Sequence, residues 1–127
     1  MKKCITVLII SFLALAMLVN VGCKKKQFDI TGPWLFYIFL QGETFEEEYT
    51  FQGDRYSGDV LWQGSVLGTY SVSDDYISFT LDYYDQDDDY VVEVYRGYVD
   101  SDTEMSGTVN IVVEGYSAVE GTWEAVY

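Results

Sequence analysis

The chain has 127 residues, with seven Lys or Arg, 21 Asp or Glu and no His, which gives a net charge of −14. Five of the basic residues lie within the first 26 positions, so the remainder, with two cations against 21 acids, carries −19. This excludes a nucleic-acid-binding protein, because contact with phosphates needs a dense basic surface. The absence of His excludes His-dependent triads and the common His-ligated metal sites. We therefore expect a protein that is not an enzyme and needs no cofactor.

Residues 1–22 predict a helical signal peptide. Lys2 and Lys3 form a short basic start, an almost unbroken apolar run follows, and Gly22 precedes Cys23. This is the layout of an export signal, with a small residue before the cleavage site. A transmembrane helix is the alternative, since the apolar run is just long enough to span a bilayer. The basic start and the small-residue ending favour cleavage.

Val21-Gly22-Cys23 resembles the end of the lipobox of bacterial lipoproteins, with Asn20 where that motif usually has Leu. The resemblance implies that Cys23 becomes the acylated N-terminus, with residues 23–29 as a tether to the membrane. Lys24 follows the cysteine, whereas such families use Asp there for inner-membrane retention. The resemblance therefore implies a lipid-anchored protein of the cell envelope, at the outer membrane. Cys4 leaves with the signal, so no intramolecular disulfide is expected.

Residues 30–127 predict one all-β domain. Apolar residues recur at every second position, as where Ile77, Phe79 and Leu81 alternate with Ser78 and Thr80. We expect eight strands, at about 33–41, 44–52, 56–63, 66–72, 75–83, 90–99, 104–113 and 119–127. The short Gly-, Asp- and Ser-containing turns between them favour a single antiparallel up-and-down β-barrel, whose closure leaves no edge unpaired. A two-sheet β-sandwich is the alternative.

A Gly-Thr-apolar signature recurs within the predicted strands. It begins at Gly68, Gly107 and Gly121. Glycine inside a strand permits a bend or the close approach of another backbone, as barrel closure requires. We interpret the repeat as a structural feature rather than a functional motif.

Gly32-Pro33-Trp34 resembles the Gly-x-Trp signature of the lipocalins. Together with Ile30-Thr31-Gly32 and the run from Gly68 to Phe79, it looks like a short bacterial lipocalin-like lipoprotein of the calycin type. The resemblance implies an eight-stranded barrel in which Trp34 plugs one end. The family's later Arg, which packs over that Trp, has no counterpart in this sequence. The domain is also shorter than the lipocalins that carry ligands.

Alternation predicts an aromatic barrel interior. The expected inward side chains are Trp34, Phe36, Phe45, Tyr49, Phe51, Val60, Trp62, Tyr70, Phe79 and Trp123. An eight-stranded barrel is just wide enough to be filled by side chains or to hold one small ligand, and this many aromatics favour filling. In the functional interpretation, a small apolar or aromatic ligand is lined by Trp34, Phe36, Tyr49, Trp62 and Tyr70.

Two charges fall on predicted inward faces. Glu47 shares the face of Phe45 and Tyr49, and Arg96 shares the face of Val92, Val94 and Tyr98. Because a buried charge is costly unless paired, we hypothesise that Glu47 and Arg96 meet inside the barrel, or that Arg96 binds an anionic ligand. The alternative is a bulge near Gly97 that turns Arg96 outward and Tyr95 inward.

Asp85, Asp87 and Asp89 place alternate carboxylates in a predicted hairpin tip, and carboxylate oxygens are ligands that Ca²⁺ takes. An EF-hand loop starting at Asp85 would need Gly at its sixth position and Glu at its twelfth, where Tyr90 and Arg96 stand. We therefore expect a solvated acidic tip, with a weak Ca²⁺ site as the alternative.

Two functions are consistent with these features. The first is an exported, lipid-anchored barrel that binds a small apolar or aromatic ligand. The alternative is an acidic protein-interaction module that docks or inhibits a basic protein through electrostatic steering. An internal cavity of roughly a few hundred Å³ would favour the ligand. A filled interior with an exposed aromatic patch would favour the protein partner.

Overall fold

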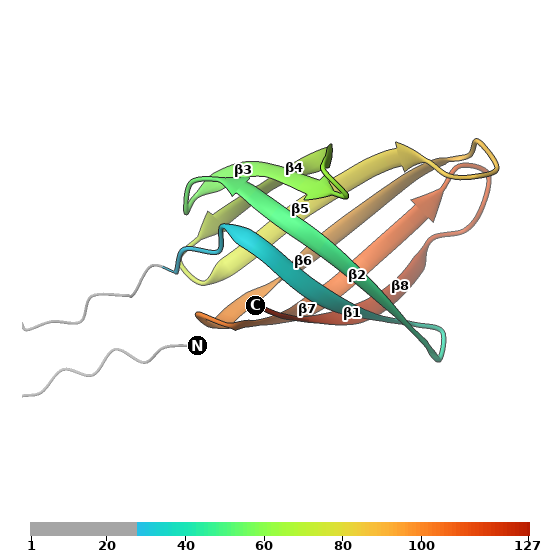
Figure 1. The fold of residues 1–127 in the computed structure, drawn as a ribbon. Helices are drawn as coiled ribbons and strands as arrows, with labels where there is room; N and C mark the ends of the chain where they lie inside the picture. The colour runs from blue at the N-terminus through green and yellow to red at the C-terminus, as the bar shows by residue number, and fades with distance from the viewer. Residues whose placement is uncertain (1–27) are drawn as a thin grey trace, which may run out of the picture.

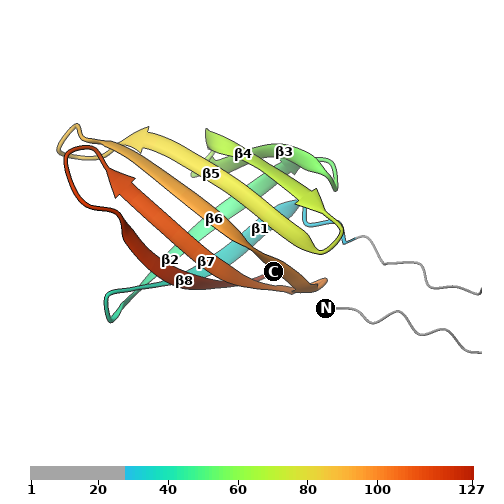
Figure 2. The same ribbon diagram turned by 180° about the vertical axis from the view of Figure 1, so that it is seen from behind.

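The computed structural model describes residues 28–127, so the predicted signal peptide, Cys23 and most of the tether lie outside the described residues. The strands are β1 (Gly32–Leu40), β2 (Glu43–Gly53), β3 (Ser57–Trp62), β4 (Ser65–Ser73), β5 (Tyr76–Tyr84), β6 (Tyr90–Ser101), β7 (Glu104–Val113) and β8 (Val119–Val126). Each pairs antiparallel with the next, and β8 pairs with β1 (Figure 1 and, from behind, Figure 2). The predicted barrel is confirmed, and the sandwich alternative is wrong. Residues 28–127 contain no apolar helix of membrane-spanning length.

Two of the hairpin turns owe their shape to glycine. Gln41 and Gly42 have φ of 50° and 83°, and Gln63 and Gly64 have φ of 49° and 83°. Two successive positive φ angles define a type I′ turn, whose twist matches that of the flanking strands. Leu40 pairs with Glu43 directly across the first turn. These turns fix the register of both hairpins.

The glycines of the Gly-Thr repeat lie where another backbone passes very close. A Cβ added at Gly68 would lie 1.7 Å from the Thr80 carbonyl oxygen, and one at Gly121 would lie 2.2 Å from the Phe39 carbonyl oxygen. The second contact lies beside the β8–β1 pairing that closes the barrel. The predicted structural role of the repeat, close backbone approach, is confirmed.

One end of the barrel is closed around Trp34. Its Nε1 donates a hydrogen bond to the Ile30 carbonyl oxygen at 2.9 Å, and Phe28 and Ile30 are buried beside it. The Tyr127 ring packs on the Trp34 ring with centroids 5.3 Å apart. Tyr127 thus covers the Trp34 ring at this end of the barrel. Phe28, which belongs to the segment predicted as tether, is itself packed against the barrel.

The closed half of the barrel is filled by aromatic rings around Phe36. The rings of Tyr49, Phe51, Phe79, Tyr95 and Trp123 lie 5.2 to 6.2 Å from the Phe36 centroid. Phe79 and Tyr95 stack with centroids 4.4 Å apart and planes 5° apart. These edge and stacked geometries are the favourable ones for aromatic pairs. In this half the interior is therefore filled by side chains, as predicted.

Candidate ligand-binding site

The other half of the barrel contains a cavity of about 460 Å³. It lies at the end where the β1–β2, β3–β4, β5–β6 and β7–β8 turns gather, which we call the mouth. The cavity is lined by Ile38, Leu40, Phe45, Glu47, Tyr49, Trp62, Ser65, Leu67, Tyr83, Tyr84, Glu93 and Ile111. The chain enters the barrel at the opposite, closed end, where the C-terminus also lies (Figure 1). The mouth therefore lies at the opposite end of the barrel from Phe28, the first residue that the structure describes.

The cavity exists because the β3–β4 hairpin is short. Residues Glu43–Tyr49 of β2 pair with β1 but not with β3, whose ladder with β2 begins at Thr50. On the other side, the pairing of β4 with β5 ends at Gly68. Figure 1 shows this hairpin ending well before the neighbouring β1–β2 and β5–β6 turns. The wall between β2 and β5 is therefore incomplete at the mouth, and side chains from both strands line the opening.

The floor of the cavity is a hydrogen-bonded group of one carboxylate and two tyrosines. Glu93 is only 7 % exposed. Tyr95 donates its hydroxyl to Glu93 Oε1 at 2.6 Å, and Tyr83 donates to Glu93 Oε2. Hydrogen bonds to a charged acceptor are the strong ones, and two of them allow this carboxylate to remain buried without a cation.

The same carboxylate makes the floor electrically negative. Burial raises the pKa of Tyr49, Tyr83 and Tyr95 above the ordinary tyrosine value, and the charge of Glu93 adds to the rise in each case. The charge of Glu47 also raises the pKa of Tyr49 and Tyr83. At neutral pH these hydroxyls are therefore protonated, and Tyr83 and Tyr95 are donors to Glu93.

The wall of the cavity carries the second carboxylate. Glu47 is half-buried on β2, and its Oε1 accepts a hydrogen bond of 2.9 Å from Trp62 Nε1 on β3. This bond joins β2 to the end of β3 at the edge of the gap, and it holds the indole ring at the cavity surface. Phe45 and Tyr84 complete an aromatic rim and are 44 % and 68 % exposed.

The structure separates the predicted ligand-lining residues into two groups. Tyr49, Trp62 and Glu47 line the cavity at the mouth. Trp34, Phe36 and Tyr70 are buried in the closed half and do not reach the cavity. Alternation placed all of these aromatic side chains inside the barrel, but it carried no information about depth along the barrel axis.

The predicted inward position of Arg96 is wrong. Arg96 is exposed, while Glu93 and Tyr95 are buried, so the face of β6 that points inward is the opposite one. The hypothesised pair of Glu47 and Arg96 does not form. The predicted alternative, a bulge near Gly97, gives the right orientation of Arg96 and Tyr95. The register irregularity of β6, however, lies between Val99 and Ser101.

The orientation of β6 is set by its neighbours. Its sequence is apolar on both faces at Val91, Val92 and Val94, so it has little preference of its own. Tyr95 is paired with Phe79 on β5 and with Val109 on β7, and both partners face inward. Because paired residues share a face, β6 must turn Glu93 and Tyr95 into the barrel.

Sequence reasoning therefore missed Glu93 and Tyr83 as functional candidates. No signal within β6 marked Glu93 as inward-facing. Its orientation follows from the pairing of β6 with β5 and β7, which also places Gly97 directly opposite Gly107.

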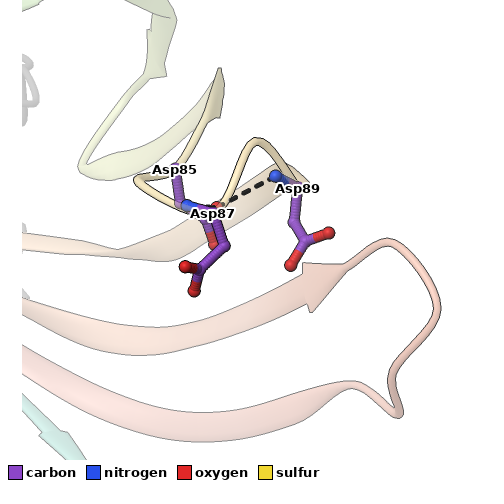
Figure 3. Close-up of side chains that lie close together, drawn as sticks. All are labelled: Asp85, Asp87 and Asp89. Carbon is purple, nitrogen blue, oxygen red and sulfur yellow. Dashed lines mark hydrogen bonds between the residues drawn. The ribbon is translucent and has the colours of Figure 1, made fainter.

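The three aspartates of the β5–β6 turn gather as predicted (Figure 3). Carboxylate oxygens of Asp85, Asp87 and Asp89 lie within 4.8 Å of one another. Asp85 Oδ1 already accepts hydrogen bonds from the backbone N–H groups of Asp87 and Asp89, each at 2.9 Å. This arrangement is a side-chain-stabilised turn, which accounts for Asp85 without a cation.

Comparisons with known proteins identify the fold. Neither the comparison with protein families nor that with curated proteins finds a match. Among solved structures, the chain is similar to EF1p2_mFAP2b in its complex with DFHBI, with a TM-score of 0.62 and 17 % identity, covering 76 % of this chain and 92 % of that one. It is also similar to the redesigned beta barrel b11L5F_LGL, with a TM-score of 0.56 and 16 % identity, covering 77 % and 90 %. At these identities the likeness shows a shared β-barrel fold.

Proposed function

We propose that this protein binds a small, largely apolar molecule with an aromatic body in the cavity at the mouth. The observation that carries the proposal is the cavity itself. Its volume of about 460 Å³ lies within the usual range for ligand sites, and it combines an apolar lining with a few convergent polar groups. The predicted alternative, an acidic module docking a basic protein, was tied to a filled interior, so the open mouth favours the ligand.

The solved structures add support at the level of the fold. EF1p2_mFAP2b, a barrel of similar fold, is bound to DFHBI, a small aromatic dye. In this chain, Phe45, Trp62 and Tyr84 present ring surfaces to the cavity. Aromatic rings of this kind stack on flat ligands, while the hydroxyls of the floor orient polar substituents.

We further propose that the protein is exported and anchored through an acylated Cys23 in the cell envelope. The layout of residues 1–23 supports export, and the fold suits an anchor there, because the described chain begins at the closed end. The mouth would then open away from the membrane. Mass spectrometry of protein extracted from its own membranes should show loss of residues 1–22 and added acyl mass on Cys23. A chain that retains residues 1–22 would contradict the proposal.

Binding is tested with phenylnaphthylamine, an uncharged dye whose fluorescence rises in apolar surroundings. The wild-type protein should bind it with a saturable rise in fluorescence. Leu67→Trp should weaken the binding, because Leu67 lines the cavity and the larger side chain occupies part of the space that the dye needs. The loss should be at least about tenfold in affinity, as expected for a ligand that fits its pocket poorly.

Leu61→Trp is the matched control. Leu61 lies on β3, next to β4, and does not line the cavity. This variant should bind the dye as the wild type does, and circular dichroism should show the same strand content in both variants. If the wild-type protein gives no saturable signal, or if both variants lose it equally, the mouth is not the binding site.

A further inference from the structure

We propose that the ligand of the mouth cavity is an organic cation, with an ammonium or similar positive head on an apolar or aromatic body. This inference rests on the proposed function, since it assigns the chemical class of the molecule bound in the same cavity. It follows from the charges that line the cavity, the lack of a cation to balance them, and the aromatic rings beside them.

Two carboxylates face the cavity, at different depths. Glu93 lies in the floor, and Glu47 lies in the wall. Both oxygens of Glu93 accept tyrosine hydroxyls, whereas Glu47 uses only Oε1, for Trp62. Among the residues that the structure describes, no other hydrogen bond reaches Glu47. Its second oxygen is therefore available to a ligand donor.

No basic side chain balances these two charges. Arg55 and Arg96 are the only cations in residues 28–127, and both are exposed. Arg55 lies in the β2–β3 turn at the closed end, and Arg96 lies on the outer face of β6. The cavity thus has two acidic groups and no basic one. In a barrel interior this is an unusual balance, because buried charges are normally paired.

A ligand that fills the cavity displaces water from both carboxylates. For a neutral or anionic ligand this desolvation is uncompensated, and it opposes binding strongly. A cationic head placed between Glu47 and Glu93 compensates it by direct attraction, which is strongest where water is excluded. Burial is the larger cause of the raised pKa values of Tyr49, Tyr83 and Tyr95, and the charge of Glu93 adds to the rise in each of them.

The aromatic rings near the carboxylates suit the same ligand. Trp62 is held by its bond to Glu47 at the cavity surface, and Phe45 and Tyr84 lie at the rim. Ring faces attract cations, with Trp the most effective, and they also stack on an aromatic body. The charge of −19 on residues 27–127 adds a long-range attraction that draws cations toward the protein and repels anions.

The experiment compares three probes that share one ring system and differ in charge: naphthylmethylammonium, naphthylmethanol and naphthoate. Calorimetric titration of the full protein at neutral pH gives the three affinities. The ammonium should bind at least about tenfold more tightly than the alcohol, as expected for a charge-assisted hydrogen bond in a cavity, and the carboxylate should bind most weakly. The ratio of ammonium to alcohol affinity should fall as salt is added.

Variants locate the charge responsible. Glu47→Gln keeps the size of the side chain and an acceptor for Trp62. It should lower the ammonium affinity about tenfold, whereas the alcohol affinity should not fall, because the neutral amide costs less to desolvate than the carboxylate. Glu48→Gln removes the same charge from the adjacent, exposed position on β2, which does not line this cavity. It should change neither affinity more than about twofold, because exposed charges are screened.

The outcomes separate the two proposals. If the alcohol binds and the ammonium gains nothing over it, the ligand is not a cation, while the proposed binding function stands. If none of the three probes and no phenylnaphthylamine binds, both proposals are wrong. If Glu47→Gln and Glu48→Gln reduce ammonium binding equally, the preference arises from net charge and not from the cavity, which also overturns the inference. Because the wild-type affinity ratio is decisive by itself, the test does not depend on the folding of a variant.

Discussion

Replacing Phe79 with alanine is expected to lower the free energy of unfolding by about 3–5 kcal/mol, the usual range for removing a buried Phe. The Phe79 ring is 1 % exposed and stacks on Tyr95, and it also packs against Phe36 and Phe51. Its loss leaves a void in the closed half that the surrounding strands cannot fill, because the barrel is closed. Urea unfolding at neutral pH measures the effect, and the thermal midpoint should fall by at least about 12 °C.

Phe45→Ala is the matched control for this prediction. Phe45 lies at the mouth, is 44 % exposed and lines the cavity. Because it is only partly buried, its removal should cost less than about 1 kcal/mol of stability. It should instead weaken dye binding at the mouth, which Phe79→Ala should not do directly. Equal destabilisation by the two substitutions would show that the mouth is packed like the closed half. That result would contradict the division of the barrel into a filled half and an open half.

Replacing Gly107 with valine should destabilise the barrel by about 3 kcal/mol, at the upper end of the range for overpacking. A Cβ on Gly107 would lie 1.9 Å from the Arg96 carbonyl oxygen and 2.5 Å from the Gly97 Cα. Both neighbours are backbone atoms of β6, so relief requires the β6–β7 pairing to move apart. Because β6 carries Glu93, that movement also disturbs the floor of the cavity. Urea unfolding measures the stability. Titration with naphthylmethylammonium measures whether the affinity of the cavity changes when its floor is disturbed.

Thr108→Ala tests whether the effect comes from the glycine contact. Thr108 is the next residue on β7, its side chain is exposed, and the bond from Trp123 Nε1 goes to its backbone oxygen. This change should alter the stability by no more than about 0.5 kcal/mol, as for most surface positions. A Gly107→Val variant as stable as Thr108→Ala would mean that β6 and β7 lie farther apart than the structure places them.

The strands and their order were predictable because the signals for them are local. Ile77, Phe79 and Leu81 alternate with polar residues, and short turns such as Gln41-Gly42 leave no room for a crossover. Glycine at the positions of the Gly-Thr repeat pointed to close backbone contacts, and the structure has them. The period of the apolar residues, the length of the turns and the positions of the glycines each depend on residues that are close together in the chain. A single sequence is therefore sufficient to predict the strands and their order.

The site was only partly predictable. Glu47, Tyr49 and Trp62 were placed inside the barrel correctly, since each follows a clean alternation. Glu93 was not, because β6 is apolar on both faces and takes its orientation from Phe79 and Val109 on the neighbouring strands. The interaction that decides the face of β6 is between strands, and no periodicity within β6 contains it.

An acidic, eight-stranded antiparallel barrel with an aromatic interior was predictable from the sequence, because side-chain alternation and turn chemistry act over a few residues. The filling of the interior at one end, its opening at the other and the two carboxylates that face the opening became known from the fold alone. The reason is geometric. The space inside a closed barrel depends on how far each hairpin reaches and on which side chains meet across it. The short β3–β4 hairpin leaves a gap that the side chains of β2 and β5 do not fill.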